Sequence, residues 1–502
     1  MGGFFGVVSS SDCVAELFYG TDYHSHLGTR RGGMAMFSQD GTIIRRIHDI
    51  TNAQFRSKFD SILHEFSGHC GIGCISDFED QPLLVNSHLG SYAIVTVSKV
   101  ANIRELAEES FRAGSSHFLG MSNGELNPTE MIASLINQKS SLCEGIEYAM
   151  NTIEGSCSML IMTHGKIIAA RDKYGRTPVS IGKRNTDGTM AVTMETSAFP
   201  NLDFVHLRDL GPGEIVELSP NHMVQLKEAG ELNQICSFFW VYFGYPSSNF
   251  EGINTESARY RNGASIAEED DYSEVDTIGG IPDSGVAHAI GYSNASGKPY
   301  QRALVKYTPT WPRSFMPQNQ NARNLVARMK LIPVEDQIRD RRLLFLDDSV
   351  VRGTQFKDIT RRLYERGAKA VHLRSASPPI MFSCKFLNFS RSRSELDLAA
   401  RRAVETLEGR QISDPALLRE YITPGTDKYN AMVEVIRKEL GLTTLKYQSL
   451  DRLIKAIGLP KERVCTYCYD GCDPTAGCAC NGCRKKGKEK NEADSAVSGR
   501  KN

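Results

Sequence analysis

A buried strand that ends on two adjacent carboxylates is the sequence feature that most constrains the fold of this chain. Residues 343–355 read LLFLDDSVVRGTQ, so four apolar residues run directly into Asp347 and Asp348. From residue 275 onwards strand-like and helix-like segments alternate, as in RALVKYT (302–308), QFKDITRRLYERGA (355–368) and KAVHLRSA (369–376). This alternation predicts βαβ units and a parallel sheet.

The turn after this strand predicts a phosphate-binding loop. Ligands of open parallel sheets bind outside the carboxyl ends of the strands. Backbone N–H groups from Ser349 to Thr354 can surround a phosphate at a helix N-terminus, and Gly353 lets the backbone approach closely. Asp347 and Asp348 can accept hydrogen bonds from vicinal hydroxyls or hold Mg²⁺. Together these groups describe a ribose 5-phosphate site; the simpler alternative is a solvated acidic pair at a helix N-cap.

A second loop, IPDSG (281–285), ends an earlier strand of the same predicted sheet. Its Pro-Asp-Ser-Gly turn presents backbone N–H groups to an anion. An ordinary turn is the alternative. Both loops would lie at the same edge of the sheet, because parallel strands end together.

The first part of the chain has a different pattern. Residues 93–100 are expected to form a strand, 102–113 a helix and 156–172 a β-hairpin, which predicts an α+β region with much antiparallel sheet. The segment 484–502 is charged and poor in aliphatic residues, as in disordered tails. We therefore expect domains at 1–235 and 236–470, with a Cys-rich and then charged tail at 471–502.

Composition excludes several classes of protein. The 502 residues favour two or more domains, and a formal net charge of zero predicts binding to neither nucleic acid nor membrane. The N-terminus has no basic stretch leading into an apolar core, and no apolar run reaches the roughly 20 residues that span a bilayer. A cytoplasmic protein is expected. Six of the 13 cysteines lie between residues 465 and 483, which suggests metal binding before disulfides.

Longer segments resemble the amidophosphoribosyltransferase family, the glutamine-dependent first enzymes of purine synthesis. The resemblance is carried by QICSFFWVYFGYPSS (234–248), TESARYRNGASIAEE (255–269), SASPPIMFSCKF (375–386), LPKERVCTYCYDG (459–471), IAARDKYGRTPVSIGKR (168–184) and LRDLGPGEIVELS (207–219). It implies an α+β Ntn-hydrolase-like domain of glutamine amidotransferase type 2. An α/β type I phosphoribosyltransferase domain with a parallel sheet would come next in the chain.

The resemblance also assigns residues to the substrate, 5-phosphoribosyl 1-diphosphate. The ribose hydroxyls would contact Asp347 and Asp348, and the 5-phosphate would contact Ser349, Arg352, Gly353 and Thr354. The diphosphate would lie on Asp283, Ser284 and Gly285, with Lys306 and Arg313 neutralising its charge. Mg²⁺ would be bound by Ser284, Asp347 and Asp348. Homo-oligomers are usual in the family, so a homo-oligomer is expected here by analogy.

Some members of the family carry a four-iron–four-sulfur (4Fe–4S) cluster on four cysteines. The counterparts in this chain are Cys236, Cys384, Cys465 and Cys468, and the Cys-x-x-Cys spacing of the last two is typical of metal sites. The alternative is a set of buried free thiols with a zinc knuckle inside the tail. Four further cysteines either bind zinc or have no metal role: Cys472, Cys478, Cys480 and Cys483.

The glutaminase half departs from the family pattern. Gly2 occupies the position of the family's N-terminal cysteine nucleophile, and Ser76 the position of the arginine that grips glutamine. The Asn-Gly oxyanion hole falls on Val97 and Ser98, and the acidic residue that binds the glutamine amine falls near Pro128. Loss of one oxyanion donor alone costs about 3–4 kcal/mol of transition-state stabilisation. We therefore expect no glutaminase activity.

Three functions remain open from the sequence. The first is an amidophosphoribosyltransferase-like enzyme that uses ammonia or another amine, which the intact loops at 281–285 and 347–354 favour. The second is a phosphoribosyltransferase with a different acceptor, favoured by the altered loop KYTPTWPRSFM (306–316). The third is a non-catalytic paralogue that binds phosphoribosyl diphosphate, favoured by the degenerate N-terminal domain. We adopt the first interpretation.

Overall fold

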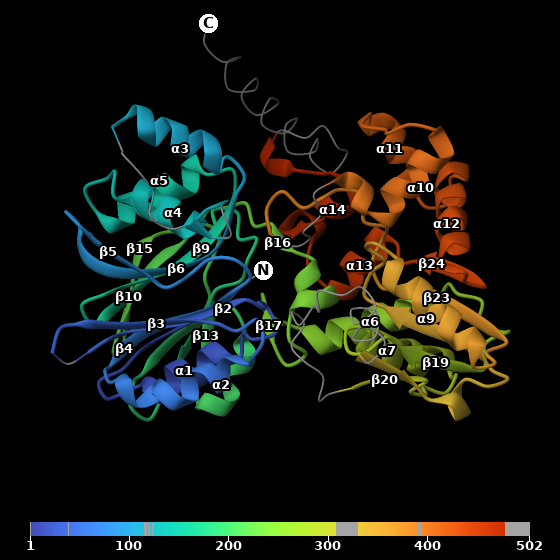
Figure 1. Cartoon of the computed structure of the whole chain (residues 1–502), viewed down its shortest axis with the longest axis horizontal. Coiled ribbons are helices and arrows are strands. Elements are labelled where there is room, and N and C mark those ends of the chain that lie inside the picture. The colour runs from blue at the N-terminus through green and yellow to red at the C-terminus, as the bar shows by residue number, and fades with distance from the viewer. Residues whose placement is uncertain are drawn as a thin grey trace, which may run out of the picture.

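The computed structural model of the chain describes residues 2–38, 40–114, 118, 121–122, 125–307, 330–388 and 394–476. Figure 1 shows two lobes side by side, an N-terminal lobe of stacked sheets and a C-terminal lobe built around a smaller sheet. The predicted tail beyond residue 476 and the segment 308–329 lie outside the described residues.

The N-terminal lobe contains two antiparallel sheets. The seven-stranded sheet has the order β13-β11-β12-β1-β4-β2-β3, with β13 (Val205–Asp209), β11 (Ser180–Lys183), β12 (Met190–Thr193), β1 (Gly3–Val8), β4 (Cys70–Ser76), β2 (Arg31–Phe37) and β3 (Ile43–Asp49). The six-stranded sheet has the order β15-β14-β10-β9-β6-β5, with β15 (His222–Lys227), β14 (Ile215–Ser219), β10 (Lys166–Ala170), β9 (Gly155–Thr163), β6 (Gly90–Val100) and β5 (Leu83–Ser87). The predicted hairpin at 156–172 is confirmed as β9 and β10.

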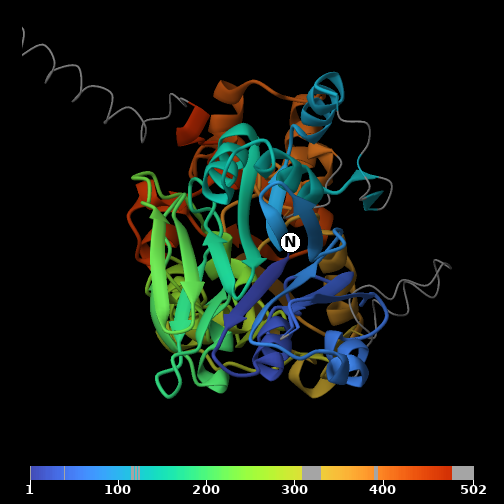
Figure 2. The ribbon, with the colours of Figure 1, turned by 90° about the vertical axis from the view of Figure 1, so that its left-hand side faces the viewer.

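The two sheets pack face to face, and helices cover their outer faces (Figures 1 and 2). Successive side chains of a strand point to opposite faces, so Val95 of β6 enters the core between the sheets while Ile94 packs under the helices. These covering helices are α3 (Ile103–Arg112), α4 (Pro128–Ile136) and α5 (Leu142–Thr152), and α1 (Val14–Asp22) and α2 (Phe55–Phe59) cover the other sheet. The α+β prediction for this lobe is confirmed.

The C-terminal lobe is built on a four-stranded parallel sheet of order β19-β22-β23-β24, with β19 (Thr277–Gly280), β22 (Arg342–Asp347), β23 (Ala370–Ser375) and β24 (Thr444–Tyr447). Alternate residues of β22 are buried on opposite faces: Leu344 packs with α6 (Thr255–Ala267) and α7 (Val286–Ser296), and Phe345 packs with α9 (Thr354–Glu365) and α12 (Asp427–Leu440). Burial on both faces explains the continuous apolar run in LLFL. The predicted parallel sheet is confirmed.

Shorter elements complete this lobe. They are α10 (Ala399–Glu408), α11 (Pro415–Ile422), α13 (Leu450–Ile457) and α14 (Tyr467–Asp470), and the antiparallel pair β20 (Leu304–Lys306) and β21 (Leu331–Pro333). A second two-stranded pair is formed by β17 (Asn249–Phe250) and β18 (Ile253–Asn254). In the N-terminal lobe, β7 (Met121–Ser122) pairs with β8 (Glu125–Leu126) between α3 and α4. Within the described residues no helix is both long and apolar enough to cross a bilayer.

The end of the described chain returns to the junction between the lobes. There β16 (Ile235–Cys236) pairs in parallel with β25 (Val464–Cys465), and Figure 1 shows β16 and α14 between the two lobes. The proposed domain boundary near residue 235 falls at this junction. The division into domains stays a prediction.

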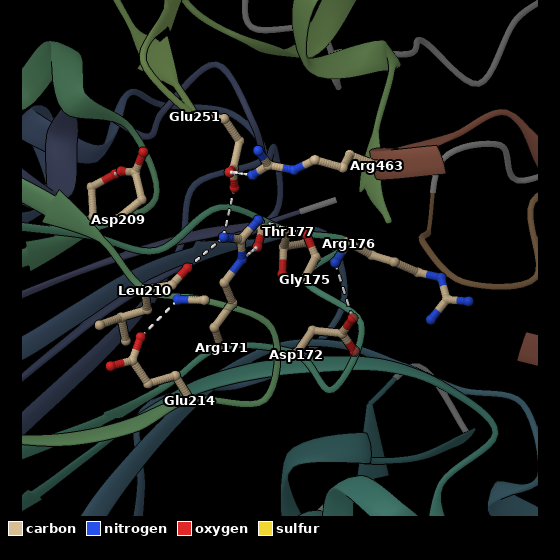
Figure 3. A network of polar contacts seen from close by, with 12 residues as sticks. Arg171, Asp172, Gly175, Arg176, Thr177, Asp209, Leu210, Glu214, Glu251 and Arg463 are labelled. Carbon is tan, nitrogen blue, oxygen red and sulfur yellow. Dashed lines mark hydrogen bonds and ion pairs between the residues drawn. The ribbon is translucent and has the colours of Figure 1, made fainter. Parts of the chain in front are cut away.

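A network of ion pairs also ties the junction together (Figure 3). The Glu251 carboxylate lies 2.7 Å from Arg171 Nη1 through one oxygen and 2.7 Å from Arg463 Nη2 through the other. Arg171 is buried and also donates to the carbonyl oxygens of Thr177 and Gly175, at 2.9 and 2.8 Å. The three charged residues come from segments far apart in sequence, so the network fixes the lobes against one another.

Candidate functional site

The carboxyl edge of the parallel sheet brings the two predicted loops into contact. β19 and β22 end together, with Gly280 paired to Leu346. The N–H of Ile281 donates to the carbonyl oxygen of Leu346 at 2.9 Å. A Cβ atom on Gly285 would lie only 2.2 Å from that same oxygen, so a side chain at this position would force the loops apart. The loop 281–285 therefore packs directly on the strand that ends at Asp347.

Hydrogen bonds join the serine of one loop to the carboxylates of the other. The Asp348 N–H donates to Asp347 Oδ1 at 3.0 Å, and Ser349 Oγ donates to Asp348 Oδ1 at 2.5 Å. The Ser284 hydroxyl also hydrogen-bonds the Asp348 carboxylate. The three residues predicted to bind magnesium, Ser284, Asp347 and Asp348, are thus brought together.

The environment of the acidic pair favours its protonated form in the free protein. Burial raises the pKa of Asp347 well above its usual range, and the charge of Asp348 raises it further. Burial also raises the pKa of Asp348, although bonds from Ser284 and Ser349 and the charge of Arg259 oppose this. An added cation or added hydrogen-bond donors would favour ionisation of the pair. Mg²⁺ and sugar hydroxyls are groups of this kind.

Arg259 of α6 was not found by sequence reasoning. Its side chain is buried, with 4% of the residue exposed, and it donates to the carbonyl oxygens of Trp240 at 2.9 Å and Gly244 at 2.8 Å. Trp240 lies within a single π-helical turn, Phe239–Phe243, and Gly244 directly follows this turn. Arg259 thereby supplies a fixed positive charge behind Asp348. An arginine inside a helical pattern is expected at the surface, so only the fold reveals this role.

The predicted 5-phosphate loop leaves one side of the site open. Gly353 adopts a φ of 74°, in the left-handed region that glycine tolerates, and α9 begins at the next residue, Thr354. Arg352 and Thr354 are exposed, whereas Asp347 is half-buried and Asp348 is buried. The Arg352 guanidinium lies 3.6 Å from the Asp397 carboxylate. An anion can therefore reach the N-terminus of α9 from solvent.

A basic residue lies beside the second loop. Lys306 is the last residue of β20, and its ammonium group forms an ion pair and a hydrogen bond with the Asp283 carboxylate. The predicted partner Arg313 lies outside the described residues. Of the two predicted basic groups, the structure therefore describes Lys306 alone and places it beside the loop 281–285.

The predicted glutamine site is reduced to a cavity of about 20 Å³. This volume holds about one water molecule. The positions identified from the sequence do come together around it: the cavity is lined by Gly2, Ser76, Asp77, Phe78, Glu79, Thr96, Val97, Ser98, Leu387 and Asn388. Pro128 lies at the start of α4 and is not among the lining residues.

Three features account for the small size of this cavity. A Cβ atom on Gly2 would lie 2.5 Å from the carbonyl oxygen of Ile75, so the backbone leaves no room for a larger residue. Glu79 fills part of the space, and burial raises the pKa of its carboxyl. Asn388 comes from the C-terminal lobe, and its side-chain amide donates to the carbonyl oxygen of Ser98 at 3.2 Å. Neither Glu79 nor Asn388 was predicted, because neither lies in a motif.

Comparison with known proteins agrees with this arrangement. Residues 72–201 match the family described as glutamine amidotransferase domain. The amidophosphoribosyltransferase of Methanocaldococcus jannaschii is 29% identical over 501 residues, covering 95% of this chain and 98% of that protein. That of Bacillus subtilis is 29% identical, covering 94% of each. The chain is thus similar over nearly its whole length to amidophosphoribosyltransferases.

Solved structures of amidophosphoribosyltransferases share the fold. The glutamine phosphoribosylpyrophosphate amidotransferase of B. subtilis, complexed with ADP and GMP, superposes with a TM-score of 0.79 at 28% identity, covering 94% of this chain and 97% of that one. A structure described as the allosteric regulatory enzyme of purine biosynthesis gives a TM-score of 0.78 at 27% identity, covering 94% of this chain and 96% of that one. The two-domain fold implied by the resemblance is confirmed.

The four cysteines assigned from the amidophosphoribosyltransferase family converge at the lobe junction. Cys236 and Cys465 are neighbours in the paired strands β16 and β25. The N–H groups of Met381 and Phe382 donate to the carbonyl oxygen of Cys468, at 2.9 and 3.1 Å, which brings the Cys384 segment alongside. Burial raises the pKa of Cys468 well above its usual range, and the charges of Cys236, Cys384 and Cys465 raise it further. These mutual effects show that the thiols share one region.

Among the residues that the structure describes, no three His, Cys, Asp or Glu side chains are grouped so that they could hold one metal ion. A 4Fe–4S cluster keeps its thiolates farther apart, because iron and sulfide atoms lie between them. Of the additional cysteines, Cys472 is described, and Cys478, Cys480 and Cys483 lie outside the described residues.

Proposed function

We propose that this chain transfers an amine, with free ammonia as the first candidate, to 5-phosphoribosyl 1-diphosphate in purine nucleotide biosynthesis. The bond between ribose carbon 1 and the diphosphate oxygen breaks, and diphosphate leaves. A carbon–nitrogen bond forms at the same carbon, and the nitrogen loses a proton, giving phosphoribosylamine. The observation that carries the proposal is the contact of Ser284 with Asp348, which unites the two phosphate-type loops at one sheet edge.

The residues would divide the substrate between them. Asp347 and Asp348 would accept hydrogen bonds from the ribose hydroxyls, while Ser349, Arg352, Gly353 and Thr354 would bind the 5-phosphate. The diphosphate would lie on Asp283, Ser284 and Gly285. Lys306 stands beside Asp283 and would stabilise the charge of the leaving diphosphate, with Arg313 as the second basic group of the proposal.

Mg²⁺ fits the acidic edge of this site. Its preferred ligands are oxygens. Ser284 offers a hydroxyl, and the half-buried Asp347 and the buried Asp348 offer two carboxylates whose ionisation an added cation favours. Bound there with the diphosphate, the metal would neutralise charge on the leaving group. The protein residues orient the sugar and exclude water from the buried side.

Two observations favour ammonia over glutamine as the nitrogen source. The residue at the nucleophile position is Gly2, which has no side chain to attack an amide. The remaining cavity of about 20 Å³ is too small for glutamine. We therefore assign no catalytic residue for glutamine hydrolysis and expect that activity to be absent.

A 4Fe–4S cluster on Cys236, Cys384, Cys465 and Cys468 belongs to the same proposal. The donor set fits, because four buried or half-buried thiols from three separate segments meet where the lobes join. A bound cluster would supply four iron–thiolate bonds that cross-link those segments. The protein would hold β16, β25 and the segment around Cys384 in place for it. A homo-oligomeric state also remains a proposal.

A second candidate function is a non-catalytic paralogue that binds phosphoribosyl diphosphate. The small cavity at the predicted glutamine site favours it, because a paralogue that only binds phosphoribosyl diphosphate needs no room for glutamine. A phosphoribosyltransferase with another acceptor amine is the third candidate. All three share the same substrate site and differ only in the step after substrate binding.

Diphosphate release in the presence of Mg²⁺ and phosphoribosyl diphosphate separates these candidates. Ammonium, glutamine and a panel of other amines are supplied separately to the full chain, and Asp348→Asn serves as the control. The proposal expects release with ammonium, background release with glutamine, and loss of at least tenfold in the variant. Substrate binding without turnover on any acceptor would identify a binding paralogue, and turnover only on another amine would identify a different transferase.

A further inference from the structure

Arg176 is a buried cation whose hydrogen-bonding capacity is largely unused. Only 1% of the residue is exposed, and its Nε and Nη1 groups have no hydrogen-bond partner among the described residues. The remaining nitrogen, Nη2, lies 3.8 Å from the Asp473 carboxylate, and the flat face of the guanidinium stacks on the Phe386 ring at 3.6 Å. Leaving two such donors unsatisfied in the interior is costly, so an acceptor is expected beside them.

Arg176 lies beside the cysteines of the proposed cluster. The N–H of Cys236 donates to the Arg176 carbonyl oxygen at 3.2 Å. Its positive charge acts on both Cys236 and Cys465, and Phe386, on which it stacks, is two residues beyond Cys384. The guanidinium is therefore close to Cys236 and Cys465 and packs on the segment that carries Cys384.

Comparison with Arg171, a nearby buried arginine, shows that unpaired guanidinium donors are not general in this segment. Arg171 lies in the same segment and is equally buried, but its guanidinium donates to the carbonyl oxygens of Gly175, Thr177 and Leu210 and pairs with Glu251. Figure 3 shows the Arg176 side chain extending away from this network. The protein itself therefore supplies acceptors for the Arg171 guanidinium. For Arg176 we expect a bound group to supply them.

We infer that Arg176 is a positioning residue for the 4Fe–4S cluster, and that its Nε–H and Nη1–H groups donate hydrogen bonds to the cluster or thiolate sulfurs. This inference rests on the proposed cluster. An iron–sulfur cluster on four thiolates carries net negative charge, which a buried guanidinium balances. Hydrogen bonds to sulfur and nearby positive charge favour the reduced cluster and so raise its reduction potential.

The test is a redox titration of the full chain, loaded with iron and sulfide under anaerobic conditions and monitored by electron paramagnetic resonance. Arg176→Gln removes the charge and is expected to change the reduction equilibrium at least tenfold towards the oxidised cluster, equivalent to a fall of about 59 mV for one electron. Arg176→Lys keeps a charge without the planar pair of donors, so a smaller fall is expected. Arg463→Gln, two residues before Cys465 but paired with Glu251, is the control and should leave the potential unchanged.

Equal potentials in the wild type and Arg176→Gln would overturn the inference. If Arg176→Gln does not fold or bind iron, the comparison uses Arg176→Lys, where equality with the wild type has the same meaning. A wild-type chain that binds no iron also overturns it. Diphosphate release measured on the same preparations keeps the two claims apart, because turnover without iron refutes only the cluster, and iron without turnover refutes only the transferase.

Discussion

At the scale of single residues, the acidic pair is expected to make the proposed substrate binding depend on pH. The pKa values of Asp347 and Asp348 are raised, so the free protein keeps protons on this pair to a higher pH than ordinary carboxyls do, and the proposed binding of Mg²⁺ and substrate would release them. Affinity is therefore expected to increase as pH rises through those raised pKa values and to level off above them. Without ligand, the free energy of unfolding changes with pH in the opposite direction. The acidic pair lowers this free energy as pH rises through the same range.

Calorimetry in buffers of different ionisation enthalpy measures this proton release. The wild type should give a binding heat that depends on the buffer, and Asp348→Asn should give a smaller dependence together with weaker binding. A binding heat that is the same in every buffer would show that the pair is already ionised.

A substitution at the nucleophile position, residue 2, tests the predicted absence of glutaminase activity. Gly2→Cys restores the thiol of the family, but its Cβ would meet the Ile75 carbonyl oxygen at 2.5 Å. We expect no gain in glutamine hydrolysis and a loss of about 1–3 kcal/mol in the free energy of unfolding from overpacking. Gly230→Cys is the control, because the first atom that its Cβ meets is 3.5 Å away. Glutaminase activity in Gly2→Cys would mean that the site is intact apart from one residue.

At the scale of elements, two glycine variants test whether the start of α9 binds the substrate. Comparing them separates an effect on binding from the loss of stability that any alanine causes in a left-handed conformation. Gly353 and Gly409 have φ angles of 74° and 68°. A Cβ atom on Gly353 would lie 2.9 Å from the Leu440 side chain. A Cβ atom on Gly409 would meet no atom of the described residues within 4 Å beyond its chain neighbours. Both alanine variants should lose about 1–2 kcal/mol in stability. Only Gly353→Ala should also weaken binding of phosphoribosyl diphosphate, measured by calorimetry. Equal affinities in the two variants would argue against a phosphate at this loop.

The sequence was most informative where function and secondary structure coincide. The run ending at Asp347 and Asp348 predicted both a buried strand and a ligand site, because a parallel strand buried on both faces must be apolar until it reaches the edge of the sheet. The contact of Ser284 with Asp348 could be expected from the same topology. Arg259 and Arg176 were missed, since arginines are normally exposed and burial depends on tertiary packing.

At the scale of the whole molecule, the lobe junction combines residues that no local pattern relates. The glutamine cavity is closed partly by Asn388 of the other lobe, and the four cysteines meet there from distant segments. The cysteines were identified only through family resemblance, and the closure of the cavity required the structure. Long-range packing of this kind is the part of the site that sequence spacing cannot specify.

The ion-pair network at the junction provides a stability test. Glu251→Gln leaves the buried Arg171 without its charged partner and should reduce the free energy of unfolding by about 3–5 kcal/mol. Arg463→Gln breaks only the more exposed pair and should cost about 0–1 kcal/mol. Chemical denaturation measures both. Equal small losses would show that Glu251 does not hold the lobes together.

The source of the transferred nitrogen tests the central claim most directly. The full chain is supplied with phosphoribosyl diphosphate, Mg²⁺, unlabelled ammonium and glutamine carrying a heavy-nitrogen label in its amide, and the trapped amine product is weighed by mass spectrometry. We expect an unlabelled product whose formation requires ammonium. A product that carries the heavy label would contradict it, because the chain would then release ammonia from glutamine despite Gly2 and the collapsed cavity.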